Sequence, residues 1–156
     1  MTAVREPSLT IAVVDDEAPV RKALARLLRA TGFGVATFAS GPEFLDSLET
    51  RCPDCAILDL HLPGLSGLDI QQRIIGRKIS MPCIVITGKD EPGNSERALA
   101  AGAAAYLKKP VDEDLLLAAI ASAVPEHAAI DKPETGRFGD TGDRISQETA
   151  EDGGRL

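Results

Sequence analysis

Five polar side chains stand at or directly after the ends of apolar segments, and their types suit one kind of chemistry. They are three acids, a hydroxyl and an ammonium: Asp15, Asp16, Asp59, Thr87 and Lys109. Clustered carboxylates repel one another, and a hard cation such as Mg²⁺, which prefers oxygen ligands, relieves that repulsion. A carboxylate beside such a cation can attack phosphorus, while a hydroxyl and an ammonium stabilise the transferred phosphoryl oxygens. The residue types therefore predict phosphoryl transfer to an aspartate.

Each of these residues also has an ordinary structural interpretation. An aspartate after a strand is most often a helix cap or a turn residue, and a threonine that ends a β-branched strand is usually packing. The prediction therefore depends on all five residues meeting at one edge of a sheet. Asp59 carries the most weight, because it closes the segment expected at the centre of that sheet.

Five short apolar segments are the predicted strands. The segments 9–14, 55–60 and 81–87 are β-branched and nearly continuous, as strands covered on both faces are, and 34–38 and 103–108 are weaker candidates. Polar residues that follow parallel strands meet in a crevice at the carboxyl edge of the sheet. If the first and third strands are neighbours, this crevice holds the three carboxylates.

Segments with helical spacing separate the strands. The predicted helices cover residues 18–30, a stretch starting at Ser40, about 66–75, about 95–101, and 112–124. In the third helix, we expect Leu68 and either Ile74 or Ile75 to face inward. Alternation of strand and helix implies a parallel sheet with right-handed crossovers and helices on both faces. We predict a doubly wound, three-layer α/β domain over about residues 8–125.

Length and charge limit the classes of protein to consider. A chain of 156 residues suits one domain, and no apolar run is long enough to span a membrane. The N-terminus lacks the pattern of a secretory signal, so we expect a cytoplasmic protein without membrane contacts. A net charge of -7, with only 4 Phe, 1 Tyr and no Trp, disfavours direct binding of nucleic acid.

Three cysteines raise a second chemical possibility. Cys52 and Cys55 form a Cys-x-x-Cys pair, which is found in redox and zinc sites, and Cys83 is the third. The pair precedes a strand instead of opening a helix, and His61 is too far along the chain to complete a zinc site. We therefore interpret the cysteines as small packing residues and keep metal or redox chemistry as the alternative.

The two ends of the chain differ from the predicted domain. Residues 1–7 are a short N-terminal extension, and residues 126–156 are rich in glycine and contain eight acids against four bases. We predict that this acidic tail is mostly disordered, with a short helix near 143–150. The alternative is a segment that folds on a partner.

Four stretches of the sequence together resemble the receiver domain of bacterial two-component response regulators. They are VVDDE (13–17), LDLHLPGLSG (58–67), VITG (85–88) and AGAAAYLKKP (101–110), and the resemblance covers nearly all of residues 9–124. The stretch VVDDEAPVRKAL is most similar to receivers of the FixJ and LuxR type. The resemblance implies a flavodoxin-like five-stranded sheet with strand order 2-1-3-4-5 and five helices.

The resemblance also implies a role for each site residue. Asp59 would accept the phosphoryl group from the phosphohistidine of a sensor histidine kinase or a phosphotransfer protein, and Thr87 and Lys109 would contact that group. Tyr106 would take the aromatic switch position, turning inward as Thr87 moves; its ordinary interpretation is core packing. The implied ligands of Mg²⁺ are the carboxylates of Asp15, Asp16 and Asp59 and the backbone carbonyl of His61. His61 and Lys89 could tune the lifetime of the phosphoryl group.

One departure from the FixJ and LuxR pattern concerns the output. Residues 125–156 lack the length and apolar content of a helix-turn-helix domain. We therefore expect a stand-alone receiver that signals to an unknown protein target through its fourth helix, fifth strand and fifth helix, with a phosphorylation-dependent homodimer as one possibility. It would catalyse only its own phosphorylation and dephosphorylation.

Two other interpretations remain open at this point. A phosphohydrolase of the haloacid-dehalogenase type also forms an aspartyl phosphate, but places a second aspartate where this chain has His61. A phosphate-independent pseudo-receiver adaptor is disfavoured because none of the acids, the threonine or the lysine is missing.

Overall fold

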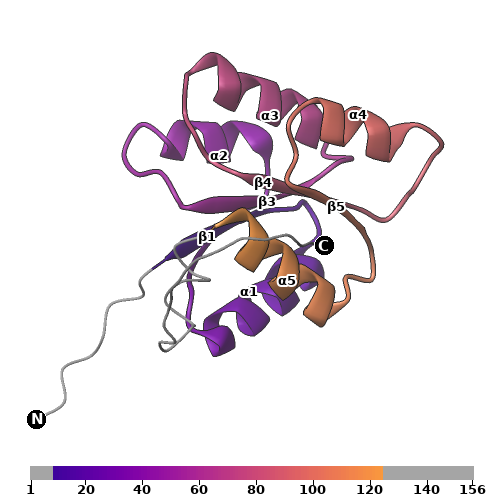
Figure 1. The fold of residues 1–156 in the computed structure, drawn as a ribbon. Coiled ribbons are helices and arrows are strands. Elements are labelled where there is room, and N and C mark those ends of the chain that lie inside the picture. The colour runs from indigo at the N-terminus through magenta and orange to yellow at the C-terminus, as the bar shows by residue number, and fades with distance from the viewer. Residues whose placement is uncertain (1–8, 125–156) are drawn as a thin grey trace, which may run out of the picture. The chain divides into compact units, whose positions relative to one another are not determined.

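All five predicted strands are present in the computed structural model, which describes residues 9–124 (Figure 1). They pair in parallel in the order β2-β1-β3-β4-β5, which confirms the expected fold class and places β1 beside β3. The strands are β1 (Thr10–Val14), β2 (Gly34–Phe38), β3 (Cys55–Asp59), β4 (Cys83–Thr87) and β5 (Ala105–Lys108).

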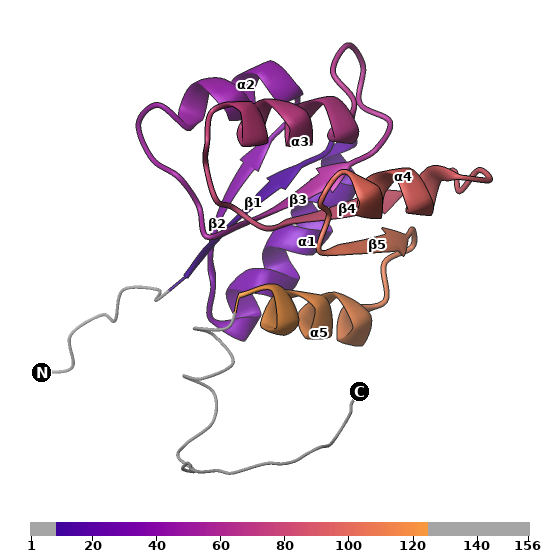
Figure 2. The same ribbon diagram turned by 45° about the horizontal axis from the view of Figure 1, so that its top comes forward.

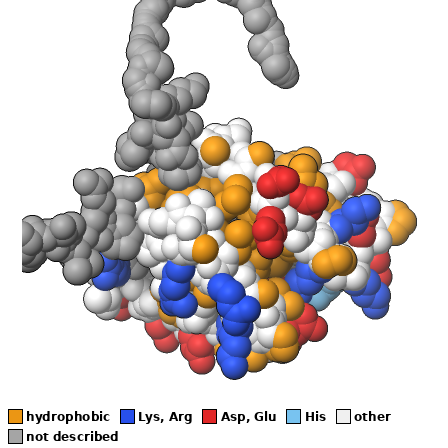
Figure 3. Space-filling view, turned by 90° about the horizontal axis from the view of Figure 1, so that it is seen from below, with side chains coloured by type: hydrophobic (Ala, Val, Ile, Leu, Met, Phe, Trp, Pro, Cys, Tyr) orange, Lys and Arg blue, Asp and Glu red, His pale blue; other side chains and the backbone are white. Residues whose placement is uncertain are grey.

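Five helices cover the sheet on both faces. They are α1 (Ala18–Thr31), α2 (Gly41–Ser47), α3 (Gly67–Gly76), α4 (Asn94–Ala100) and α5 (Glu113–Ala123). Figures 1 and 2 show α2, α3 and α4 on one face and α1 and α5 on the other, and Figure 3 views the α1 and α5 side as a surface. Three layers result, as predicted.

Local sequence explains where the helices begin and end. The hydroxyl of Ser66 accepts from the amide of Asp69, whose carboxylate accepts from the amide of Ser66, so a capping box starts α3. Asp112 caps α5 by accepting from the amide of Leu115. Gly32 ends α1 with a φ of 110°, a conformation that glycine adopts without steric cost.

Alternate strand residues supply two main cores. The core under α1 and α5 uses Ile11, Val13, Ile57 and Ile84 with Leu28, Leu116 and Ile120, while the core under α2 and α3 uses Val14, Leu58, Phe44 and Ile70. The layer under α4 is thinner: its buried members are Leu60, Val85, Ala98 and Ala103. The most deeply buried strands are thus β1, β3 and β4, and four of the five predicted site residues lie at or directly after their ends.

The alternative chemistry of the cysteines finds no support in their surroundings. Cys52 is exposed, Cys55 and Cys83 are buried, and all three are free thiols. Burial raises the pKa of Cys55 and of Cys83 to about 12, so both remain protonated and behave as packing residues. Within residues 9–124, the one group of three or more close metal-ligating side chains is a cluster of aspartates.

Several predictions concern parts of the chain outside the described residues. The N-terminal extension at 1–7, the acidic tail at 126–156 and the helix near 143–150 all lie there. Within residues 9–124, none of the helices has both the length and the apolar character to span a bilayer.

The register of α3 is resolved in favour of Ile74. Ile74 is 1% exposed and packs under the helix, whereas Ile75 is 58% exposed. Ile74→Ala should lower the free energy of unfolding by about 2–4 kcal/mol, because it leaves a cavity in the core. Ile75→Ala should change it by no more than about 0.5 kcal/mol. Urea denaturation of the two variants checks the register, and equal losses would contradict it.

Candidate functional site

The carboxyl ends of β1 and β3 bring three aspartates together. Val14 lies opposite Leu58 in the ladder, so Asp15 and Asp59 leave the sheet side by side. One carboxylate oxygen from each of Asp15, Asp16 and Asp59 lies within 4.8 Å of the others. A pocket of about 320 Å³ opens over them, and Asp16, Asp59, His61, Lys89 and Lys109 are among the residues that line it. We call it the acidic pocket.

Backbone amides hold two of the three carboxylates in place. Asp15 is fully buried, and its Oδ1 accepts from the amide of Glu17 at 2.8 Å. Asp59 is 4% exposed, and its Oδ1 accepts from the amide of His61 at 3.2 Å. Asp16 is exposed and forms no polar contact with the described residues. The set therefore combines two fixed carboxylates with one that is free to turn.

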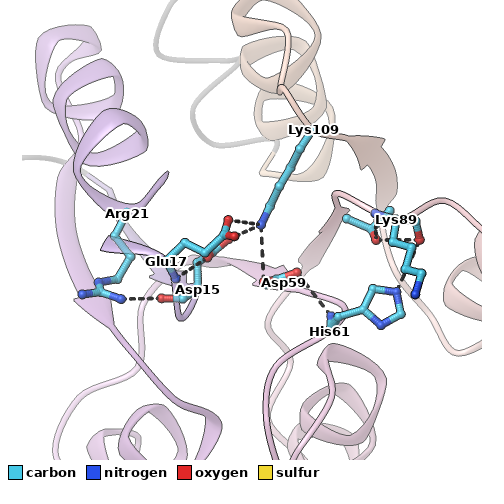
Figure 4. A network of polar contacts seen from close by, with 8 residues as sticks. Asp15, Glu17, Arg21, Asp59, His61, Lys89 and Lys109 are labelled. Atoms are coloured by element: carbon cyan, nitrogen blue, oxygen red, sulfur yellow. Dashed lines mark hydrogen bonds and ion pairs between the residues drawn. The ribbon is translucent and has the colours of Figure 1, made fainter. Parts of the chain in front are cut away.

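Lys109 is the counter-ion of the acidic pocket. Its Nζ lies 2.8 Å from Asp15 Oδ2, 3.3 Å from Glu17 Oε1 and 3.4 Å from Asp59 Oδ2 (Figure 4). The lysine side chain is only 15% exposed, so water screens these ion pairs less than it screens surface pairs. One ammonium thus serves three carboxylates from two strand ends.

The pKa values of Asp59 and Lys109 are both raised in the folded protein. Burial and the neighbouring Asp15 carboxylate raise the pKa of Asp59, although Lys109 and the His61 amide oppose the shift. Burial disfavours the charge on Lys109, but the carboxylates of Asp15 and Asp59 outweigh it and raise the pKa of Lys109. Negative charge in the acidic pocket is therefore only partly compensated by the protein.

The donor set fits a hard cation. All three clustered side chains offer oxygen, the ligand atom of Mg²⁺. Asp15 Oδ2 is buried, and its one close polar partner among the described residues is the ammonium of Lys109 at 2.8 Å. A carboxylate oxygen has two lone pairs, so this one can accept from Lys109 and still bind a cation. Asp15, Asp16 and Asp59 could therefore hold a divalent cation at the mouth of the acidic pocket.

Two loops meet beside Asp59 through a threonine and a histidine. Thr87 is fully buried, and its hydroxyl donates to the carbonyl of Lys89 at 3.0 Å and accepts from the amide of Lys89 at 3.0 Å. His61 Nε2 lies 3.3 Å from the same carbonyl, and Figure 4 shows the ring pointing toward the Lys89 backbone. The loop after β4 is thus tied both to its own strand and to the loop after β3.

Gly67 permits a close backbone approach behind Asp59. A Cβ at this position would lie 2.8 Å from the carbonyl oxygen of Asp59, closer than real Cβ atoms come. The amide of Gly67 also donates to the carbonyl of Leu60 at 3.1 Å. The start of α3 is therefore held directly against the end of β3.

Tyr106 lies on β5 with its hydroxyl on a loop carboxylate. The hydroxyl donates to Asp90 Oδ1 at 2.8 Å, while Asp90 Oδ2 lies 3.7 Å from Lys108 Nζ. The ring packs against the thin layer under α4. Tyr106 is therefore linked to the loop that also carries Lys89.

The structure brings the three predicted aspartates and Lys109 together, but the hydroxyls of two other predicted site residues point away from Asp59. The hydroxyls of Thr87 and Tyr106 bond to the loop after β4 and not to Asp59. Sequence reasoning missed Glu17 as a partner of Lys109, although it is the third acid in a row after β1. It also missed Arg21, which donates to the carbonyl of Asp15 at 2.7 Å, and Asp90, which accepts from the hydroxyl of Tyr106. No spacing or motif in the sequence points to either contact.

Residues 11–121 match the response regulator receiver domain family. This chain belongs to that family. The transcriptional regulatory protein FixJ of Bradyrhizobium diazoefficiens is 34% identical over 124 residues, which are 80% of this chain and 60% of FixJ. Nodulation protein W of the same organism is 39% identical over 111 residues, which are 71% of this chain and 49% of that protein. The chain spans about half to three fifths of these two relatives, so this receiver domain is the part that they share with it.

Two solved receiver structures match this chain over nearly their whole length. A response regulator receiver protein from Burkholderia phymatum has 42% identity and a TM-score of 0.69, covering 76% of this chain and 96% of that one. A CheY-like receiver domain protein from Methanospirillum hungatei has 29% identity and a TM-score of 0.71, covering 78% and 98%. The receiver fold is therefore supported by both sequence and structure.

Replacing the central carboxylate should make the metal-free domain more stable. Because the pKa of Asp59 is raised in the folded state, the free energy of unfolding falls as pH rises from the ordinary pKa of 3.8 to the raised one, and it stays lower above that. Asp59→Asn should therefore raise the free energy of unfolding at about pH 7 in EDTA, with a gain that shrinks toward about pH 4. Urea denaturation at both pH values measures the gain.

A matched control separates this effect from a general change in net charge. Asp46 lies on the exposed side of α2, so Asp46→Asn removes the same charge outside the acidic pocket. We expect no comparable gain in this variant. Equal gains in both variants, or a gain for Asp59→Asn that is independent of pH, would contradict the proposed repulsion.

Proposed function

We propose that this receiver accepts a phosphoryl group on Asp59 from a sensor histidine kinase or a phosphotransfer protein and then changes its contacts with another protein. The observation that carries the proposal is the position of Asp59 at the floor of the acidic pocket, beside two further aspartates and 3.4 Å from the ammonium of Lys109. The pocket thus contains a nucleophilic carboxylate, oxygen ligands for a cation, and an ammonium that can donate hydrogen bonds to a phosphoryl group.

In this proposal, Asp15, Asp16, Asp59 and the backbone carbonyl of His61 hold Mg²⁺. When bound, the cation neutralises charge on the carboxylates and on the transferred phosphoryl oxygens. A carboxylate oxygen of Asp59 forms the new bond to phosphorus as the bond from phosphorus to the donor imidazole breaks. The electron pair of that broken bond stays on the imidazole nitrogen, so the products are an aspartyl phosphate and a histidine.

Lys109 and Thr87 then stabilise the product. Lys109 already lies beside Asp59 Oδ2, so it needs little movement to donate to a phosphoryl oxygen. The hydroxyl of Thr87 releases the carbonyl of Lys89 and donates to the phosphoryl group instead. Because that carbonyl also contacts His61, loss of the threonine bond loosens the loop after β4.

Tyr106 carries the change to the surface. In the described state, its hydroxyl is held by Asp90 on the same loop, and we propose that movement of the loop breaks this bond and lets the ring turn inward. The surface formed by α4, β5 and α5 then contacts an unknown protein target or a second copy of the chain. Signalling by a stand-alone cytoplasmic receiver through protein contact is part of the same proposal.

Phosphorylation can be tested without knowing the kinase. Incubation with acetyl phosphate and Mg²⁺ should add one phosphoryl group to the intact protein, and Asp59→Asn should abolish the addition. Intact-mass spectrometry measures the adduct, and peptide mapping after borohydride reduction locates it. Asp46→Asn is the matched control and should be phosphorylated like the wild type. Unchanged mass in the wild type, or an adduct that persists in Asp59→Asn, would overturn the proposal.

The same reaction distinguishes the receiver from a phosphohydrolase. A receiver should release phosphate no faster than its own aspartyl phosphate forms and decays. Release of many phosphates per chain from small phosphate esters would favour a phosphohydrolase instead. Enzymes of the haloacid-dehalogenase type have a second aspartate at the position where this chain has His61. Adding EDTA should stop formation of the adduct if the clustered acids act through a cation.

The contact between Tyr106 and Asp90 makes a second measurable prediction. Burial, together with the hydrogen bond to Asp90 and the charge on Asp90, raises the pKa of Tyr106 to about 12. Asp90→Asn should return this pKa toward the ordinary value of 10.0, so that far more tyrosinate is present at about pH 11. Ultraviolet absorbance reports Tyr106 alone, since the chain has 1 Tyr and no Trp.

An exposed acid on α5 provides the control for this titration. Asp114→Asn removes the same charge away from β5 and should leave the titration of Tyr106 unchanged. At neutral pH, acetyl phosphate and Mg²⁺ should alter the fluorescence of Tyr106 in the wild type but not in Asp59→Asn. If the titration of Tyr106 is unchanged in Asp90→Asn, then Asp90 does not hold the hydroxyl of Tyr106, and the proposed role of this contact is wrong.

A further inference from the structure

A row of positive side chains lies along α1, outside the acidic pocket. Its members are Arg21, Lys22, Arg26 and Arg29, which line a single hollow on the surface. Leu24 and Leu28 of the same helix face the core. The cations therefore lie on the side of α1 that faces away from the core. They extend over about 12 Å along the helix.

The row is not neutralised by the rest of the described domain. α1 has no acid in its first turn, and none of the four cations forms an ion pair with a described residue. Arg21 and Arg29 donate to the backbone carbonyls of Asp15 and Val35, while Lys22 and Arg26 have no polar contact within residues 9–124. Like charges four residues apart, such as Lys22 and Arg26, destabilise a helix, so the stability of α1 does not account for this pair.

The cations border a groove between α1 and the edge strand β2. The groove has a volume of about 540 Å³, and its other lining residues are Ala25 and Thr37, whose short side chains leave the space open. Figure 3 shows blue Lys and Arg side chains grouped on the lower half of the face that carries α1 and α5. We call this feature the α1 groove.

We propose that the α1 groove binds an acidic segment of a partner protein. An anionic occupant fits, because four cations border the space and none of them has a carboxylate partner within residues 9–124. An extended polypeptide of about four residues spans the ~12 Å row, and guanidinium groups suit carboxylates with paired hydrogen bonds. No aromatic side chain lines the groove, so it offers no surface on which the base of a nucleotide or nucleic acid could stack.

The net charge of the whole chain does not prevent this contact. The chain carries a charge of -7, but at about 0.1 M salt exposed charges more than ~10 Å apart are largely screened. A carboxylate inside the groove therefore responds mainly to the four nearby cations. Binding should weaken as salt is added, because the contacts are exposed ion pairs.

The α1 groove and the acidic pocket share no lining residue. Their nearest connection is Arg21, which lines the groove and donates to the backbone carbonyl of Asp15. A partner segment could therefore occupy the groove while Asp59 remains open to a phosphoryl donor. The groove acts as an anchoring surface that works in both phosphorylation states.

An oligoglutamate peptide provides a direct test on the full chain. A peptide of about six residues is long enough to cover the groove when extended. We expect amide chemical shifts in NMR to move along α1 and β2 when this peptide is added at low salt. Lys22→Gln with Arg26→Gln should weaken the affinity about fivefold to tenfold, as expected for the loss of two exposed ion pairs. These two residues lie outside the acidic pocket, so phosphorylation by acetyl phosphate should be unchanged.

A second double variant makes the comparison specific. Arg51→Gln with Arg73→Gln removes the same charge from exposed positions outside the groove and should leave the affinity unchanged. Equal weakening by both double variants, or shifts scattered over the surface, would show non-specific attraction and overturn the proposal. Binding of inorganic polyphosphate together with no binding of oligoglutamate would overturn it in favour of a phosphate ligand. Success or failure of this test is independent of whether Asp59 is phosphorylated.

Discussion

The ion pairs of one lysine connect the ends of three strands at the acidic pocket. Lys109 follows β5, yet its ammonium lies between Asp15 after β1 and Asp59 at the end of β3. The sheet order makes this possible, because β1 and β3 are neighbours and the side chain of Lys109 reaches across β4. Without that positive charge, two buried carboxylates would face each other with only one backbone amide each as compensation, which favours uptake of a proton. The topology and the chemistry therefore depend on the same contact.

The clustered aspartates of the acidic pocket lower the stability of the domain. The pKa of Asp59 is raised by burial and by Asp15 even with Lys109 in place, so the folded state holds more negative charge than it neutralises. Such an excess is common at functional sites and is offset by favourable packing elsewhere. Here the two main cores beneath the helices provide that packing. In the proposed function, a bound cation or a phosphoryl group would compensate this excess charge.

Sequence patterns predict the architecture and the meeting of the acids, because both follow from periodicity and from the rules for parallel sheets. Strand ends lie within about two residues of their predicted places, and the caps at Ser40, Ser66 and Asp112 coincide with the predicted helix starts. The choice between Ile74 and Ile75 required the angle at which α3 packs on the sheet. The direction of the Thr87 hydroxyl and the bond from Tyr106 to Asp90 depend on loop conformation and rotamers, which no periodic pattern encodes.

The thin layer under α4 has a consequence for motion. Two of its four buried residues are alanines, Ala98 and Ala103, and α4 has only seven residues, so this helix loses little dispersion energy when it slides over the sheet. Near its start, the buried side chain of Asn94 has an amide nitrogen without a hydrogen-bond partner among the described residues. The free energy of local opening should therefore be lower here than over the thicker layers, and amide hydrogens of α4 should exchange with solvent sooner than those of α1 or α3. Among the helices of residues 9–124, α4 is thus one that a rearrangement at the neighbouring sheet edge could displace at little cost in packing.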